Sequence, residues 1–547
     1  MSTFHVSRAL AGWLALALVV VLPRGGLTGN ADVDVWNHAW GLWWVADALS
    51  HGQIPWFTEL LGAPDGGVLY YIDAIGALGS LPFTLTLGPH FAYEALVIGR
   101  VALAGFFACA LARELWGEGP HAVLAGVAYA TCPMLLCELQ NGITEVAAIY
   151  WIPAAALAAY RAVRLATPVA WALLGVVLGL SVLANFYYGL VTVGLAAGVW
   201  ALRSRSPRGL LLAAAVLILI ALPGAWALRA SLADPAALVM RAQGLNRELA
   251  SHNAVDPQVF WMPGSFTSVD LEGKYGEAFR HTGYLRWSVI LLAGAGTLLR
   301  LRGNRRHTGE IVVFAALSLV LALGPQLWFG GRFVLFDHHP VFLPFAHLQR
   351  LVPELAITHP LRLSVAAQAM VAVLAARALV GRPAWIVGVL SLVVAAEGMF
   401  GSLAVWPIPE SSPRIPAIYH EIAEQTDSRG VLDLPGDVGT RMATSQYFWF
   451  QTVHSHPVPY KPDARANDNG DPATFALLPN RMARDTTPAP LDRIALDHLQ
   501  QTYGWVIIHP EFEARAGLPA SLRSTLEPAL GAPVERDGLL VWRLPPP

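Results

Sequence analysis

Residues 28–50 read TGNADVDVWNHAWGLWWVADALS and follow the first long apolar stretch of the chain. If this segment is helical from about Asp34, one stripe of the helix carries four tryptophans, namely Trp36, Trp40, Trp43 and Trp44. The opposite stripe carries Asp34, Asn37, His38 and Gly41. Because tryptophan prefers the headgroup level of a bilayer, the pattern predicts an interfacial helix with a carboxylate face turned from the lipid. An ordinary amphipathic helix that Asp34 merely caps is the alternative.

The composition indicates a polytopic membrane protein. Hydrophobic residues make up 55% of the 547 positions and charged residues 14%, against about 25% charged in a soluble chain. Too little polar surface exists to cover an ordinary soluble core. The net charge of -2 and the lack of a basic run exclude a nucleic-acid partner. The three cysteines lie in apolar stretches, so neither a disulfide framework nor a zinc site with paired cysteines is expected.

Eleven apolar stretches are long enough to cross about 30 Å of hydrocarbon. They span approximately residues 9–21, 95–112, 122–139, 146–160, 169–184, 190–202, 210–228, 285–299, 311–327, 363–380 and 385–404. The first stretch resembles a signal peptide, but the Pro23-Arg24 pair and the lack of a clear cleavage site favour an uncleaved anchor. We therefore expect an α-helical polytopic membrane protein with about eleven transmembrane helices.

The basic residues predict the orientation of these spans, because Lys and Arg accumulate on the cytoplasmic side. They fall in alternate loops: Arg8, Arg113, Arg161, Arg164, Arg203, Arg205, Arg208, Arg300, Arg302, Arg305, Arg306, Arg377 and Arg382. The N-terminus is then cytoplasmic and the C-terminus lies on the opposite side. Three outer segments become large, at 24–94, 232–284 and 329–362. A chain arranged in this way is expected to act on the outer face.

The last part of the chain is much richer in charge than the rest. Residues 408–547 contain 12 basic and 17 acidic residues, which is typical of a soluble domain. Strands are expected at 430–434, 505–509 and 539–544, with helices near 444–450 and 491–502. We predict a transmembrane domain over residues 1–407 and a small extracytoplasmic α/β domain over residues 408–547.

Several motifs resemble those of the GT-C superfamily of membrane glycosyltransferases. The first outer loop combines an acidic residue, the Trp-rich helix and the runs Gln53-Ile-Pro-Trp-Phe and Ala63-Pro-Asp-Gly-Gly. More closely, it is similar to bacterial mannosyltransferase-like and arabinose-transferase-like proteins, in which Gly-Asp precedes Trp-x-x-Trp-Trp. Counting back from Trp43-Trp44 aligns their Asp with Asp34 and leaves Asp32 as the fallback, since this chain has Asn-Ala-Asp-Val-Asp there. Arg350-Leu-Val-Pro-Glu and His359-Pro-Leu-Arg362 are similar to the family's late outer loop.

The resemblance implies transfer of a sugar from a polyprenyl-phosphate donor to a lipid, glycan or protein acceptor, at the outer face of a bacterial inner membrane. Asp34 would then be the base that deprotonates the acceptor hydroxyl. The phosphate needs positive charge, for which the candidates are Arg350, Arg362 and His359, with His347 as a helper. Ordinary headgroup contact is the alternative for both arginines. His38, Asn37 and Glu145 are candidate substrate-binding residues.

Other charged residues leave alternatives open. The resemblance allows a divalent cation, with Asp270 or Glu277 as its carboxylate, but most charges of this loop are expected to form a solvated surface. Arg100 lies in the second expected span, where it either snorkels or pairs with Glu94. Two other kinds of function compete with the transferase: a transporter or flippase of a lipid-linked substrate, which would favour repeated halves, and a non-catalytic scaffold derived from such enzymes.

Overall fold

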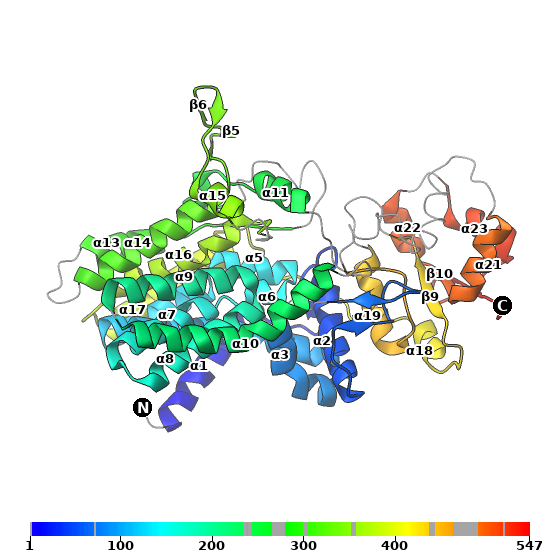
Figure 1. Cartoon of the computed structure of the whole chain (residues 1–547), viewed down its shortest axis with the longest axis horizontal. Helices are drawn as coiled ribbons and strands as arrows, with labels where there is room; N and C mark the ends of the chain where they lie inside the picture. The colour runs from blue at the N-terminus through cyan, green and yellow to red at the C-terminus, as the bar shows by residue number, and fades with distance from the viewer. Residues whose placement is uncertain are drawn as a thin grey trace.

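The computed structural model describes residues 3–69, 73–204, 206–233, 238, 243–264, 279–298, 305–351, 357–436, 443–462, 491–517 and 520–547. Long helices form a bundle at one end of the molecule, and a small sheet covered by helices lies at the other end (Figure 1). The helix that carries the tryptophan stripe, α2 (Val35–Ser50), lies between these two parts.

The expected spans all correspond to helices. The bundle comprises α1 (Thr3–Val21), α3 (Ala74–Trp116), α4 (His121–Ala130), α5 (Pro133–Asn141), α7 (Trp151–Leu165), α8 (Pro168–Ala184), α9 (Phe186–Arg203), α10 (Pro207–Ala233), α13 (Trp287–Leu298), α14 (Arg305–Ala322), α16 (Val365–Arg377) and α17 (Ala384–Phe400). Among the described residues, 5 helical stretches are long and apolar enough to cross a membrane, and four further apolar helices are shorter. The fold is therefore that of a helical membrane protein.

The helices of the bundle differ in how much of their surface is covered. Helix α16 is buried almost completely, because α3, α4, α13 and α14 all pack against it. Helix α10 packs mainly against α8 and leaves apolar side chains such as Leu211 and Leu219 exposed. An apolar surface of this kind is suited to contact with lipid.

The first part of helix α3 lies within residues 24–94, which were expected to form a large outer segment. The helix begins at Ala74 and has 43 residues, with non-helical backbone angles at Gly88 (φ 85°, ψ 167°). At 1.5 Å per residue, an unbroken helix of this length would be about twice as long as the hydrocarbon layer is thick. The part before Gly88 exposes Leu78, Phe83 and Leu85, so the end of this outer segment is an apolar helix.

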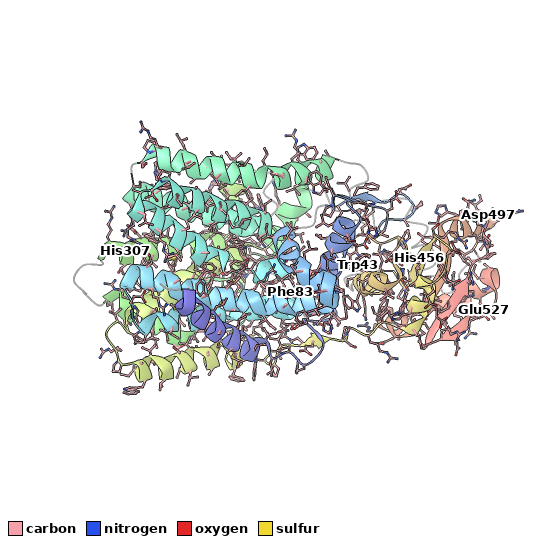
Figure 2. All side chains as sticks on the ribbon, turned by 90° about the horizontal axis from the view of Figure 1, so that it is seen from below. Trp43, Phe83, His307, His456, Asp497 and Glu527 are labelled. Carbon is pink, nitrogen blue, oxygen red and sulfur yellow. The ribbon has the colours of Figure 1, made fainter. Side chains whose placement is uncertain are left out.

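The tryptophan stripe of α2 is covered by protein, which corrects the expectation that it faces the headgroups. The side chains of Trp36, Trp40 and Trp44 are buried, with at most 2% of each residue exposed. Helix α2 packs against α3 on one side and α19 (Ala443–His454) on the other, so Trp43 appears between Phe83 and His456 in Figure 2. Trp40 stacks on Trp44, with 5.6 Å between the ring centroids, and donates a 2.8 Å hydrogen bond to Gln451 Oε1.

Shorter elements connect the helices of the bundle. They are α6 (Thr144–Ala147), α11 (Gln243–His252), η1 (Pro257–Phe260), α15 (Pro344–Leu351), η2 (Pro360–Ser364), and the strands β2 (Phe57–Thr58), β3 (Gly67–Val68), β4 (Trp328–Phe329), β5 (Arg332–Phe333), β6 (Leu335–Phe336) and β7 (His339–Pro340). Strand β1 (Leu27–Thr28) pairs antiparallel with β8 (Glu410–Ser411). This pairing ties the segment before α2 to the segment that leaves the bundle.

The C-terminal part contains a four-stranded sheet of order β11-β12-β10-β9. Its strands are β9 (Gly430–Leu434), β10 (Tyr503–Ile508), β11 (Val534–Arg536) and β12 (Leu539–Arg543), and its helices are α18 (Ala417–Ala423), α19, α21 (Arg493–Thr502), α22 (Pro510–Ala516) and α23 (Leu522–Leu530). Strands β9 and β10 are parallel, and the other pairs are antiparallel. The strands and helices expected from the sequence in this part are all present, within a few residues of their predicted ends.

Candidate functional site

Asp34 lies at the start of α2, in the N-cap position, but its side chain makes no capping hydrogen bond. Backbone hydrogen bonds fix the position of Asp34 instead. The Asp34 N–H donates to the carbonyl of Asn141 at 3.2 Å, and the Asn30 N–H donates to that of Gln140 at 2.8 Å. The half-buried Asp34 side chain is therefore positioned by the C-terminal end of α5.

Two glycines allow the chain before α2 to cross the end of α5 closely. Gly142 has a positive φ of 73° and ends α5 in the left-handed conformation. A Cβ built on Gly142 would lie 2.7 Å from Cα of Val35, and one built on Gly29 would lie 2.9 Å from Cα of Gly142. Larger residues would push Asp34 away from α5.

A buried chain of polar side chains lies on the polar side of α2. Arg100 of α3 donates to both carboxylate oxygens of Asp73 at 2.7 Å, and the Thr144 hydroxyl donates to Asp73 Oδ2 at 2.6 Å. Thr144 Oγ1 also lies 3.1 Å from His38 Nδ1, and His38 Nε2 lies 3.4 Å from Glu145 Oε2. Helices α2, α3 and α6 thus supply one connected chain from Arg100 to Glu145.

The protonation states along this chain agree with its geometry. Burial lowers the pKa of His38, although Asp34 and Asp73 oppose the shift. The single hydroxyl proton of Thr144 points to Asp73, so Thr144 accepts from His38 Nδ1, and the Nε2 of a neutral His38 carries a lone pair. Burial, reinforced by Asp73, raises the pKa of Glu145 to about 7. A protonated Glu145 is the form that can donate to this lone pair.

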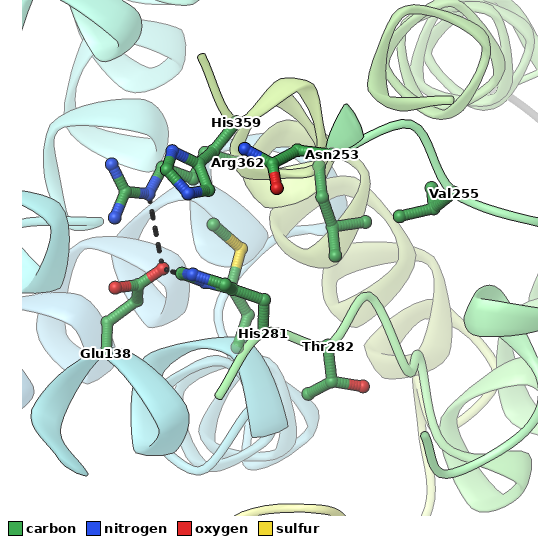
Figure 3. A pocket seen from close by; sticks show the side chains of 9 residues that line it. Glu138, Asn253, Val255, His281, Thr282, His359 and Arg362 are labelled. Carbon is green, nitrogen blue, oxygen red and sulfur yellow. Dashed lines mark hydrogen bonds and ion pairs between the residues drawn. The ribbon is translucent and has the colours of Figure 1, made fainter. Parts of the chain in front are cut away.

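A pocket opens beside this polar chain (Figure 3). It is lined by Met134, Glu138, Asn253, Val255, His281, Thr282, His359, Leu361 and Arg362. Glu138 Oε1 lies 3.4 Å from Arg362 Nε and 3.3 Å from His281 Nδ1. The rings of His281 and His359 are 4.9 Å apart. The pocket therefore holds one guanidinium and two imidazoles around a single carboxylate.

Arg362 connects the pocket to the polar chain. Its guanidinium lies over the ring of Tyr187, 5.6 Å from the centroid. The positive charge of Arg362 lowers the pKa of His38, in the same direction as burial does. It also lowers the pKa of Glu145, although burial and Asp73 raise that pKa by more. The hydrogen bond that Arg362 donates to Glu138 is long, at 3.4 Å. The guanidinium is therefore a cation that a stronger anion can bind.

The structure thus brings Asp34, His38, Glu145, His359 and Arg362 to one region at the end of the bundle that faces the C-terminal part. Asn37 lies on the same helix, and its Oδ1 is buried without a hydrogen-bond partner among the described residues. This acceptor is suited to a hydroxyl or amide donor on a ligand.

Other predicted site residues lie elsewhere. Asp32 is exposed and forms an ion pair with Arg515 Nη1 of α22 at 2.8 Å. Arg350 is exposed on α15 with its guanidinium over the ring of Phe342, and His347 is exposed on the same helix. A role for Arg350 in phosphate binding stays a prediction.

Three residues of the site were not predicted as site residues: Asp73, Thr144 and His281. The expected pair of Arg100 with Glu94 is wrong, because Glu94 instead accepts from the backbone N–H and hydroxyl of Thr28 at 2.6 and 2.8 Å. An arginine inside an apolar helix needs a buried carboxylate. A search for such a partner over the whole preceding loop would have included Asp73.

The part of the chain that the structure describes contains no group of three or more His, Cys, Asp or Glu residues arranged to hold a metal ion. The two carboxylates considered for a cation, Asp270 and Glu277, lie outside the described residues. The chemistry of the described site is therefore that of a half-buried carboxylate next to buried cations and imidazoles.

No protein-family model and no curated protein matches the chain. Solved structures do match it. The chain is similar to the archaeal oligosaccharyltransferase AglB from Archaeoglobus fulgidus, solved with an inhibitory peptide and a dolichol-phosphate: the TM-score is 0.50 and the identity 14%, over 96% of this chain and 71% of that one. It is also similar to the arabinofuranosyltransferase AftD from Mycobacteria, with a TM-score of 0.50 and 17% identity over 93% of this chain and 37% of that one. Both are GT-C glycosyltransferases, and the chain has the GT-C fold of membrane glycosyltransferases.

Proposed function

We propose that the chain is a membrane glycosyltransferase. It transfers a sugar from a polyprenyl-phosphate-linked donor to a lipid, glycan or protein acceptor on the outer face of a bacterial inner membrane. The observation that carries the proposal is the position of Asp34 in a GT-C fold: it starts α2, and its backbone bonds to Asn141, whose side chain contacts Glu138 in the pocket of Arg362. The dolichol-phosphate bound to the similar AglB supports a lipid-linked donor.

Each residue of the site has a role in this reaction. Asp34 takes the proton of the acceptor hydroxyl as that oxygen attacks the anomeric carbon. Arg362 binds the phosphate that leaves, with His359 beside it, and stabilises the charge that the phosphate retains. His38, Asn37 and Glu145 offer donors and acceptors to sugar hydroxyls. Because the leaving phosphate is a stable anion, no general acid is needed.

The arrangement in the membrane belongs to the same proposal. Eleven spans over residues 1–407 place the N-terminus in the cytoplasm, and residues 408–547 form an extracytoplasmic domain. The contact between α2 and α19 supports a role for that domain in fixing the helix that carries Asp34. The outer segments then surround the acceptor.

The test is transfer of labelled sugar by purified protein from a panel of polyprenyl-phosphate donors. Asp34→Asn removes the base without changing the size of the side chain, so the transfer rate should fall by about 10²- to 10⁴-fold. Asp32→Asn is the matched control. Its carboxylate is exposed and paired with Arg515, so this variant should keep most of the activity.

Four results would contradict the proposal. Full activity of Asp34→Asn would remove Asp34 from the mechanism, and loss of activity only in Asp32→Asn would move the base to that residue. Absence of transfer from every donor, together with movement of a lipid-linked sugar across vesicle membranes, would identify a flippase. Absence of both activities would leave a scaffold.

A further inference from the structure

His281 is a buried imidazole. One ring nitrogen faces a carboxylate, and the other has no hydrogen-bond partner among the described residues. The residue is 8% exposed and lines the pocket beside Arg362 (Figure 3). Its Nδ1 lies 3.3 Å from Glu138 Oε1. Its Nε2 is buried and has no hydrogen-bond partner among the described residues. A buried polar atom in this state is costly unless a ligand satisfies it.

The imidazole is held firmly in this position. The backbone N–H of Arg280 donates to Asn141 Oδ1 at 2.9 Å, and Asn141 Nδ2 donates back to the carbonyl of Arg280 at 2.9 Å. Two residues after His281, the carbonyl of Gly283 accepts from Gln368 of α16 at 3.1 Å. The segment is thus fixed to both α5 and α16, so His281 cannot easily turn its Nδ1 away from Glu138.

We propose that His281 is a ligand of the donor's phosphate, and that it binds the phosphate only when the imidazole carries a proton on each nitrogen. This inference rests on the proposed function, because it takes the pocket ligand to be a phosphodiester. An ionised Glu138 only accepts hydrogen bonds, so the Nδ1 that faces it carries a hydrogen. The Nε2 of a neutral His281 then carries a lone pair, which repels a phosphate oxygen. The imidazolium form donates from Nε2 as well.

The charges around His281 make this proton uptake favourable. The negative charge of Glu138 in α5 and the positive charge of Arg362 in η2 balance each other. Both side chains are at most 10% exposed. A phosphodiester adds one negative charge, and a proton on His281 restores the balance. His359 is the other titratable group that faces His281, and its Nδ1 lies 2.9 Å from Thr358 Oγ1. Arg280 is the adjacent cation in the chain.

The test is binding of a short-chain prenyl methyl phosphodiester to the full-length protein in nanodiscs. This probe keeps a single negative charge over the range in which imidazoles titrate, about pH 5 to 8, so any pH dependence belongs to the protein. We expect the affinity of the wild type to fall about tenfold per pH unit on the alkaline side, because one proton is bound with the ligand. Calorimetry in buffers of different ionisation enthalpy should report this proton directly.

Two variants assign the proton to one residue. His281→Gln keeps a donor of similar reach that never titrates, so its affinity for the probe should lose the tenfold change per pH unit that His281 contributes. His359→Gln should keep the pH dependence of the wild type. An unchanged slope in His281→Gln, a flat profile in the wild type, or no binding of the probe at any pH would each overturn the inference.

The outcomes also separate this inference from the proposed function. Sugar transfer by a protein whose probe affinity is flat with pH would leave the transferase in place and remove the role of His281. A steep pH dependence that disappears in His281→Gln, in a protein that transfers no sugar, would keep the phosphate site and remove the enzymatic activity.

Discussion

Glu145 combines deep burial with a protonation equilibrium close to neutral pH. The residue lies in α6, between the expected third and fourth spans, and only 7% of it is exposed. Burial and the nearby Asp73 raise its pKa from 4.5 to about 7. The folded protein therefore binds this proton more tightly than the unfolded chain does. The charge of Glu145 should therefore change around physiological pH.

The stability of the protein should depend on pH through this residue. As the pH rises from about 4.5 to about 7, the folded state loses up to about 3 kcal/mol relative to the unfolded state, because the unfolded chain ionises this carboxyl while the folded protein still holds its proton. Glu145→Gln lacks this penalty. It should raise the midpoint of thermal unfolding in detergent at pH 8 and leave it almost unchanged at pH 4.

A matched control is Glu118→Gln, which removes an exposed carboxylate 3.5 Å from Arg113. This variant should change the unfolding midpoint little at either pH, because exposed pairs contribute little to stability. If Glu145→Gln raised the midpoint of thermal unfolding equally at pH 4 and pH 8, the raised pKa of Glu145 would not be the cause of the stabilisation.

Individual residues of the site could be predicted when a motif or a helical spacing identified them. Asp34 and His38 share one face of a helix, and Arg362 opens a late span, so they could be predicted from the sequence alone. Asp73 and His281 could not, because their roles arise from contacts with Arg100 and Glu138 that are far away in the chain. No spacing rule connects residues that only the packing of helices brings together.

At the scale of elements, the crossing of α2 over the end of α5 sets the position of Asp34. Gly142→Ala should destabilise the protein in two ways. An alanine with φ near 73° costs about 1–2 kcal/mol, and its Cβ would lie 2.7 Å from Cα of Val35, which adds about 1–3 kcal/mol of overpacking. Since relief of this contact displaces α2, sugar transfer should fall as well.

Gly52→Ala provides the control for this substitution. Gly52 follows α2, has a φ of 71°, and a Cβ at this position would meet nothing within 4 Å. Gly52→Ala should lose only the roughly 1–2 kcal/mol that an alanine at this positive φ costs, as measured by thermal unfolding. It should keep its transfer activity. Similar losses in both variants would mean that the close contact between α5 and α2 does not matter.

The helix before Gly88 shows why element boundaries differ from the sequence prediction. Gly79, Pro82 and Pro89 are residues that usually interrupt helices, and the second span was expected to begin only at residue 95. In the structure α3 continues through Pro82, and the backbone leaves helical geometry only at Gly88. Tertiary packing of α3 against α2 overrides the local preference.

At the scale of the whole molecule, the tryptophan stripe shows how a second folded part changes an interpretation. The spacing of the tryptophans correctly predicts a helix with one apolar face, but burial against any apolar surface satisfies that face. Residues of α19 supply this surface, as the ring of Trp449 lies 6.2 Å from that of Trp36. Periodicity alone does not tell lipid from protein.

Four of the arginines that were predicted to be cytoplasmic share two carboxylates at one end of the bundle. Glu114 pairs with Arg161 and Arg164 at 3.2 and 2.6 Å. Glu310 pairs with Arg203 and Arg306 at 2.7 and 3.4 Å. His307, next to Arg306, lies at the opposite end of the molecule from Glu527 of the C-terminal part in Figure 2. Since these loops share one end, the charge rule predicts that this end is cytoplasmic.

This orientation can be measured with single cysteines. Glu118 lies in the turn after α3 at the arginine end, and Glu511 lies in α22 of the C-terminal part, and both are exposed. A membrane-impermeant maleimide should label Glu511→Cys in intact spheroplasts, but should label Glu118→Cys only after the membrane is made permeable. The native Cys109, Cys132 and Cys137 are buried, so the wild type should give little background. Labelling of Glu118→Cys alone in intact cells would invert the orientation and place Asp34 and the pocket on the cytoplasmic side, where the proposed donor and acceptor would have to be sought instead.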